Sequence, residues 1–178
     1  GITEDFLQSV DLDEAEGYSL MFVARQKRCI GWVGLQDETR AEARESLAAL
    51  MQHGVRCIAM VTGDRKPVAM RVAREIGCAE VVAECLPQNK VEFVRGIKSK
   101  GYRVAVVGDG VNDAPALAAA TAALAMRHGA GLACAVAGFV AVRDDPRAAS
   151  RVLDAAARLR TVLRQNYAWA IGYNALLV

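Results

Sequence analysis

The sequence predicts an α/β fold in which a parallel sheet carries helices on both faces. Short apolar runs alternate with longer amphipathic segments, at the spacing typical of strand–helix–strand units. Polar, glycine-containing segments follow two of the apolar runs, Val55–Val61 and Arg103–Val107. In parallel sheets, ligands bind beyond the carboxyl ends of the strands, so these two segments are the first candidates for a site.

The elements follow one another in a regular order. Leu20–Ala24 and Cys29–Leu35 are apolar runs joined by a polar turn, which predicts a β-hairpin. Further strands are expected at Val55–Val61, Val81–Ala83, Arg103–Val107, Ala122–Met126 and Phe139–Val142. Helices are expected from Thr39, as N-cap, to His53, then over Pro67–Ile76, over Pro87–Lys100, from Pro115, and from Pro146 through Arg164 into an apolar tail.

Composition narrows the class of protein. A chain of 178 residues predicts one domain with a small appendage. The net charge of +2, without a block of Lys and Arg interleaved with aromatic residues, argues against nucleic acid as a partner. The five cysteines include no C-x-x-C pair, which argues against a disulfide framework or a zinc knuckle.

The segment GDGVNDAPAL, which begins at Gly108, is the strongest chemical signal. Asp109 and Asp113 place two carboxylates in one loop at a strand end, and Gly108 and Gly110 allow a close backbone approach to a ligand. Mg²⁺ is usually held by one or two carboxylates together with phosphate oxygens and water. Asn112 would donate its amide to a phosphate oxygen. The alternative is a solvent-exposed turn, for which Asn, Asp and Gly are common residues.

Two weaker signals accompany this loop. Thr62, Gly63 and Asp64 follow the strand Val55–Val61, where a hydroxyl and free backbone N–H groups can bind a phosphate. Lys90, in LPQNK, lies in the first turns of a helix, and its ammonium would suit a phosphoryl group. Taken singly, the tripeptide reads as a plain turn and the lysine as a solvated side chain.

Together, the three motifs resemble a known family. The order strand–Thr, helix–Lys, strand–GDxxxD resembles that of haloacid-dehalogenase-like phosphotransferases. The sequences of the three motifs, VTGD, LPQNK and GDGVNDAPAL, resemble those of the P-type ion-pumping ATPases. The resemblance implies that Thr62 and Lys90 hold the phosphoryl group. It also implies that Asp109 and Asp113 serve Mg²⁺ and that Asn112 assists at the phosphate.

The resemblance extends to a hinge and a tail. The segment GLQDETR looks like the family's hinge, which would place Asp37 and Arg40 near the nucleotide, although Ala41 stands where the family usually has Pro. RQNYAWAIGYN looks like the start of the membrane helix in heavy-metal pumps. Tyr173 and Asn174 match a Tyr-Asn pair that helps to bind metal in the copper branch, and they read otherwise as interfacial residues.

By this resemblance the chain is a fragment of a heavy-metal, copper-type P-type ATPase. Residues 1–30 would end the nucleotide-binding domain, 31–150 would form most of the phosphorylation domain, and 151–178 would form a connecting helix and the start of a transmembrane helix. The family's phosphorylated Asp-Lys-Thr-Gly-Thr run does not occur in the sequence. The chain alone is therefore expected to be inactive. Met126–Ala133 also departs from the polar segment usual in the family.

The implied ligands are ATP, Mg²⁺ and a transported heavy metal, Cu⁺ in the first place. The implied partners are a membrane, reached through the C-terminal helix, and a copper chaperone that supplies the intact pump. The region would lie mostly on the cytoplasmic side. Two alternatives stay open: a soluble haloacid-dehalogenase-like phosphatase, which would need an N-terminal Asp nucleophile, and a non-catalytic regulatory module derived from a pump.

Overall fold

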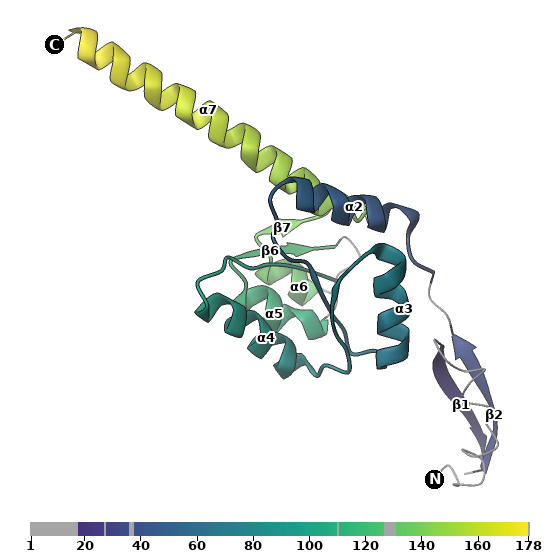
Figure 1. The fold of residues 1–178 in the computed structure, drawn as a ribbon. Coiled ribbons are helices and arrows are strands. Elements are labelled where there is room, and N and C mark those ends of the chain that lie inside the picture. Colours follow the sequence, from purple (N-terminus) through teal and green to yellow (C-terminus); the bar gives the residue numbers. More distant parts are fainter. Residues whose placement is uncertain (1–17, 27, 36–37, 110, 127–130, 178) are drawn as a thin grey trace.

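The computed structural model describes residues 18–26, 28–35, 38–109, 111–126 and 131–177 (Figure 1). The strands are β1 (Ser19–Arg25), β2 (Arg28–Leu35), β3 (Ala59–Val61), β4 (Glu80–Val82), β5 (Ala105–Gly108), β6 (Ala122–Ala125) and β7 (Phe139–Val140). The helices are α2 (Ala41–Gln52), α3 (Lys66–Ile76), α4 (Pro87–Ser99), α5 (Ala114–Ala119), α6 (Gly131–Val136) and α7 (Ala148–Leu177), with a short 3₁₀ turn, η1, at Val111–Asp113.

The strands form three hydrogen-bonded groups. β1 and β2 make the predicted antiparallel hairpin, β3 pairs with β4 in parallel, and β5, β6 and β7 pair in parallel in that order. The predicted parallel pairing is therefore confirmed. Within the described residues, however, the ladder does not join β3 to β5, so the expected single sheet is divided into two groups at that point.

Helices pack tightly on the three-stranded group because the residues between them are small. α5 contacts α4, α6, β5 and β6. Leu117 of α5, with 1% of its surface exposed, packs with Ala125 and Ala133, which are fully buried. Alanine at these positions lets helix and strand backbones approach closely, and so the cluster fixes the loop between β5 and α5 against a rigid layer.

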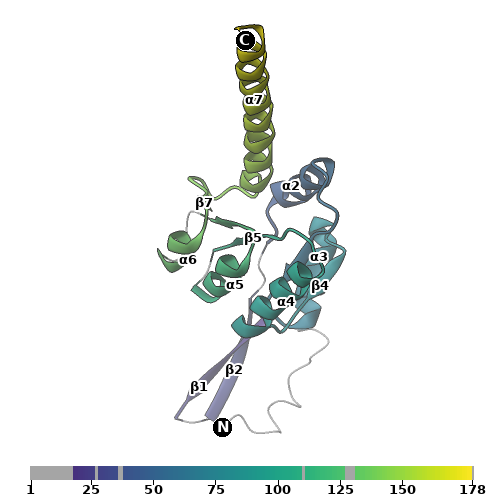
Figure 2. The same cartoon turned by 90° about the vertical axis from the view of Figure 1, so that its left-hand side faces the viewer.

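α2 connects the α/β body to α7. Ser46, with 2% of its surface exposed, donates its hydroxyl to the Pro146 carbonyl at 2.7 Å. At the end of α2, His53 Nε2 lies 3.2 Å from a carboxylate oxygen of Asp154. From there α7 extends away from the body, while the β1–β2 hairpin extends on the opposite side (Figures 1 and 2). These two contacts hold α2 against the start of α7.

Several predicted boundaries are corrected. Thr39 is not the cap of α2: Arg40 holds the N-cap position, and the Thr39 hydroxyl donates to Glu75 instead, at 2.8 Å. The strand expected from Val55 pairs only over β3, because β4 offers three residues for pairing. α6 was not predicted, since its start at Gly131 carries no capping signal.

The long C-terminal helix is confirmed as one continuous element, α7, through Leu177. Across the described ranges, no helix has both the length and the apolar character required to cross a bilayer. The expected boundary between the first two regions, at residue 30, falls inside β2. The three-part division of the chain stays a prediction.

Candidate functional site

An ion pair brings two of the predicted site residues together. Lys90 Nζ donates to Asp113 Oδ1 at 2.7 Å, and the two side chains are 17% and 20% exposed. Lys90 lies on the first turns of α4, which Pro87 begins at a position where its missing N–H costs nothing. Asp113 ends η1 and occupies the N-cap position of α5, without a capping hydrogen bond from its side chain. The contact therefore joins α4 to the loop that follows β5.

Gly108 makes room for the Asp113 carboxylate. A β-carbon at Gly108 would lie 2.9 Å from the Asp113 β-carbon and 3.0 Å from its Oδ2, closer than atoms of this kind approach. The glycine at the end of β5 is thus required by close packing of the acidic side chain. Asp109 follows directly and is exposed, and Asn112 is exposed within η1, so both remain open to a ligand.

In the loop after β3, the two predicted polar side chains contact each other. The Thr62 hydroxyl donates to Asp64 Oδ2 at 2.7 Å, and the Asp64 amide donates to Thr62 Oγ1 at 3.2 Å. Gly63 lies between them, exposed, near the carbonyl of Cys85. The loop stands at the carboxyl end of β3, as predicted. Within the described parts of the chain, the contacts found do not join it to Lys90 or Asp113.

Arg40 contacts a residue that sequence reasoning missed. Its Nη1 donates to the Asp144 carbonyl at 2.5 Å, and its Nη2 pairs with the Asp144 carboxylate. Asp144 lies just beyond β7, at the same sheet edge as Asp109 beyond β5. Asp144 and Asp145 stand one residue after the apolar run Phe139–Val142, a polar signal at a strand end that marks Asp144 but not its partner. Asp37, the other predicted hinge residue, lies outside the described residues.

The two residues predicted to bind transported metal lie far along α7. Tyr173 is 65% exposed, and the Asn174 amide donates to the Ala170 carbonyl of its own helix at 2.7 Å. Both lie in the last turns of α7, whose far end stands away from the sheet in Figure 1. The described part of the chain does not bring them near Lys90 or Asp113.

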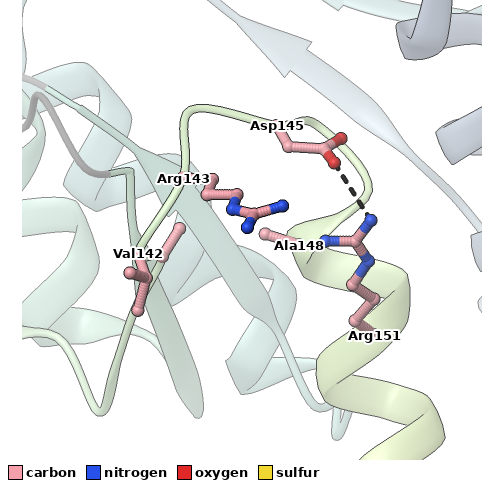
Figure 3. Close-up of a pocket in the computed structure, with 6 residues that line it drawn as sticks. Val142, Arg143, Asp145, Ala148 and Arg151 are labelled. Carbon is pink, nitrogen blue, oxygen red and sulfur yellow. Dashed lines mark ion pairs between the residues drawn. The ribbon is translucent and has the colours of Figure 1, made fainter.

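A hollow of about 280 Å³ lies elsewhere, beside the start of α7 (Figure 3). Asp145 lines it and pairs with Arg151 at 3.1 Å and with Arg147 at 3.0 Å. The hydrogen bond from Arg147 lowers the pKa of the Asp145 carboxyl from 3.8 to about 2. These charged side chains pair with one another within the loop and α7. The hollow therefore belongs to the contacts that hold the start of α7.

The donor set of the β5 loop fits Mg²⁺. Mg²⁺ takes one or two protein carboxylates and completes an octahedron with water and phosphate oxygens. Asp109 is exposed, and Asp113, the second carboxylate of the loop, is partly exposed beside Lys90. A site held by protein ligands alone is not indicated, because the described residues contain no group of three or more His, Cys, Asp or Glu side chains placed to hold a metal.

Comparison with known proteins identifies the family. The sequence model of the haloacid dehalogenase-like hydrolases matches residues 3–121, which is more than half of the chain. The chain belongs to the haloacid dehalogenase-like hydrolases. In this family member, the loops after β3 and β5 and the lysine of α4 stand in the order that the sequence motifs predicted.

Relatives of this hydrolase-family chain are heavy-metal P-type ATPases. A copper-exporting P-type ATPase B of Archaeoglobus fulgidus is 38% identical over 178 residues, which is 100% of this chain and 25% of the relative. A zinc-exporting P-type ATPase of Mycobacterium marinum is 44% identical over 147 residues, 82% of this chain and 20% of the relative. The chain thus spans about a quarter or less of the relatives' length.

A solved structure supports the same grouping. The crystal structure of a zinc-transporting PIB-type ATPase superposes with a TM-score of 0.77 at 31% identity, over 96% of this chain and 28% of that one. The agreement covers α7 as well as the α/β body of the hydrolase-like chain, because nearly the whole chain is matched.

Proposed function

We propose that the chain is part of an ATP-driven heavy-metal transporter and forms the Mg²⁺- and phosphoryl-binding half of its phosphorylation site. The observation that carries the proposal is the contact of Lys90 with Asp113, which gathers a cation and a carboxylate beyond the strand ends. The similarity to P-type ATPases over the full length of the chain supports it.

Each residue would have a distinct task. Lys90 would place its ammonium against the transferring phosphoryl group and offset its negative charge. Thr62 would donate its hydroxyl to a phosphoryl oxygen once released from Asp64, with the Gly63 and Asp64 amides beside it. Asn112 would donate its amide to the same group.

Asp109 and Asp113 would hold Mg²⁺. When bound, the ion would supply charge neutralisation at the phosphate oxygens. Asp113 would then be shared between the metal and Lys90, so that the lysine sets the position of the carboxylate. Arg40, together with Asp37 of the preceding hinge, would contact the nucleotide.

The phosphorylated carboxylate would come from a segment outside the 178 residues. The division of the sheet between β3 and β5 supports this arrangement. Thr62 follows β3 and Asp109 follows β5, so the residues assigned to phosphoryl binding and to Mg²⁺ flank the division. A parallel strand paired with both edges would end beside both loops.

Copper is the proposed cargo, bound in the intact pump with help from Tyr173 and Asn174. The relatives include exporters of copper and of zinc, so the copper assignment depends on this residue pair alone. The far end of α7 would lead into the membrane and the α/β body would lie on the cytoplasmic side, with the proposed division at residues 30 and 150. A copper chaperone would deliver the ion to the intact pump.

A chimeric pump tests the proposal. This chain would replace the matching quarter of the Archaeoglobus fulgidus exporter, and metal-stimulated ATP hydrolysis and acid-stable phosphoenzyme would be measured. We expect both activities in the chimera and neither in the isolated chain. The substitution Asp109→Asn should abolish them, whereas Glu92→Gln, an exposed carboxylate on α4, should not. Phosphatase turnover by the isolated chain would contradict the proposal, as would an inactive chimera that folds.

A further inference from the structure

The guanidinium of Arg40 is held on one side and open on the other. Two of its N–H groups bind the carbonyl and the carboxylate of Asp144, and the arginine side chain is still 49% exposed. An arginine carries five N–H donors in a rigid plane, so three donors remain for another ligand. The contact therefore orients the arginine without using up its binding capacity.

Hydrogen bonds hold the backbone on both sides of the Arg40–Asp144 pair. The Arg40 carbonyl accepts the Ala43 amide at 2.9 Å at the start of α2, and Thr39 is tied to α3 through Glu75. Asp144 lies between Ala141, whose amide donates to Ala125 of β6 at 2.8 Å, and the Pro146 carbonyl that Ser46 binds. Neither residue is carried on a loose loop, so their pairing is preorganised.

The pair stands at the sheet edge that bears the candidate site. Asp144 follows β7 as Asp109 follows β5, and the two strands flank β6 in one parallel group. Hydrogen bonding to Asp144 raises the pKa of the Arg40 guanidinium, and the charge of Asp109 contributes to the rise. Arg40 is thus within electrostatic reach of the acidic loop.

We propose that Asp144 is a positioning residue, which holds the Arg40 guanidinium toward the β5 loop so that its free donors meet the phosphates or ribose of MgATP. The inference deepens the proposed function, because it depends on Arg40 being a nucleotide contact. Asp144 itself does not touch the nucleotide. Without its carboxylate, the arginine side chain must give up rotamer freedom on binding, and the affinity for nucleotide falls.

The test is MgATP titration of the 178-residue chain, followed by NMR of the arginine side-chain N–H groups. We expect Asp144→Asn and Arg40→Gln each to raise the Kd for MgATP about three- to tenfold, as for loss of a charge-assisted contact. The double variant should lose no more than either single variant, because one acts through the other. Asp144→Glu should restore part of the affinity.

Two controls separate positioning from other effects. Asp145→Asn removes the neighbouring negative charge, which pairs with Arg147 and Arg151, and should leave the Kd within about twofold. Ser46→Ala loosens the segment that carries Asp144 without touching its carboxylate, and should raise the Kd by less than Asp144→Asn does. In the NMR spectrum, only Asp144→Asn should sharpen the Arg40 signals toward those of a freely rotating side chain.

The outcomes divide the two proposals. If Arg40→Gln weakens MgATP binding and Asp144→Asn does not, the positioning role is wrong and the nucleotide role of Arg40 stands. An equal loss of MgATP affinity in Ser46→Ala would mean that Asp144 only stabilises the local structure. Tighter MgATP binding in Asp144→Asn would mean that Asp144 competes with the nucleotide for Arg40. Either result would overturn the positioning role. If MgATP leaves the Arg40 signals of the unaltered chain unmoved, the nucleotide role fails and the positioning role fails with it.

Discussion

Lys90 and Asp113 form a contact of 2.7 Å between α4 and the turn after β5, and both side chains are largely shielded from water. Asp113 is held from a second side, because it packs against the bare backbone of Gly108. The carboxylate thus has a position set by one cation and one glycine. A ligand that joins Mg²⁺ to a phosphoryl group would meet both charges in place.

Removal of Lys90 should change Mg²⁺ affinity and ATP hydrolysis in opposite directions. In Lys90→Met, the isolated chain should bind Mg²⁺ about threefold more tightly, because a competing positive charge near the carboxylates is lost. ATP hydrolysis by the chimeric pump should fall at least about a hundredfold, because the phosphoryl charge is no longer offset. Calorimetric titration and a phosphate-release assay measure the two.

Lys98→Met is the matched control, since Lys98 lies on the same helix but donates to the Ala119 carbonyl at 2.6 Å. It should leave the affinity for Mg²⁺ unchanged. Equal effects of the two substitutions on Mg²⁺ binding would remove the special role of Lys90.

A methyl group at Gly108 should disturb Asp113. Gly108→Ala places a β-carbon 2.9 Å from that of Asp113, so the acidic turn must shift. We expect a loss of about 1–3 kcal/mol in the free energy of unfolding, as for overpacking, together with weaker Mg²⁺ binding. Urea unfolding measures the first quantity. Gly96→Ala, in open space on α4, should instead stabilise the chain by about 0.5–1 kcal/mol.

The tie between α2 and α7 should depend on Ser46. Ser46→Ala leaves the part-buried Pro146 carbonyl without its donor and should cost about 1–3 kcal/mol in the free energy of unfolding. Ser99→Ala, an exposed hydroxyl bonded to Gly96, should cost little. Urea unfolding compares the two, and equal losses would show that the buried contact contributes nothing particular.

The ion pairs of Asp145 at the start of α7 should break only in strong acid. Arg147 and Arg151 hold the Asp145 carboxyl in its charged form, and its pKa falls from 3.8 to about 2. A lowered pKa stabilises the folded state fully above about pH 4, and this stabilisation is lost as the pH falls through about 2. Carbon NMR of Asp145 should show its midpoint near 2, rising toward 3.8 in Arg147→Ala. A midpoint at the ordinary value in the unaltered chain would contradict the pairing.

The sequence predicted the alternating elements and the parallel pairing because each strand is a short apolar run with a turn signal behind it. The hairpin Ser19–Leu35 and the long helix α7 were both expected. α6 was missed because the sequence just before Gly131 has no Ser, Thr, Asp or Asn to signal the start of a helix. The division of the sheet was not predicted, since the local pattern of a strand does not say which strand it pairs with.

The candidate site was predicted in part for a similar reason. Motif spacing put Lys90 and Asp113 at one sheet edge, and the structure brings them into contact. Local spacing says nothing of contacts between segments far apart in the chain, so the pairing of Arg40 with Asp144 was missed. Thr62 was expected to face a phosphate, whereas in the structure its hydroxyl is turned to Asp64.

Mg²⁺ binding by the β5 loop tests the central claim most directly. The isolated 178-residue chain would be titrated with Mg²⁺ while the backbone amides of residues 108–113 are followed by NMR, beside Asp109→Asn, Asp113→Asn and the control Glu92→Gln. The account predicts saturable shifts confined to this loop and its contacts. It also predicts at least about a tenfold weaker affinity in each Asp variant, which equals about 1.4 kcal/mol, and no change in the control. Shifts that do not saturate, or an affinity indifferent to Asp109 and Asp113, would contradict it.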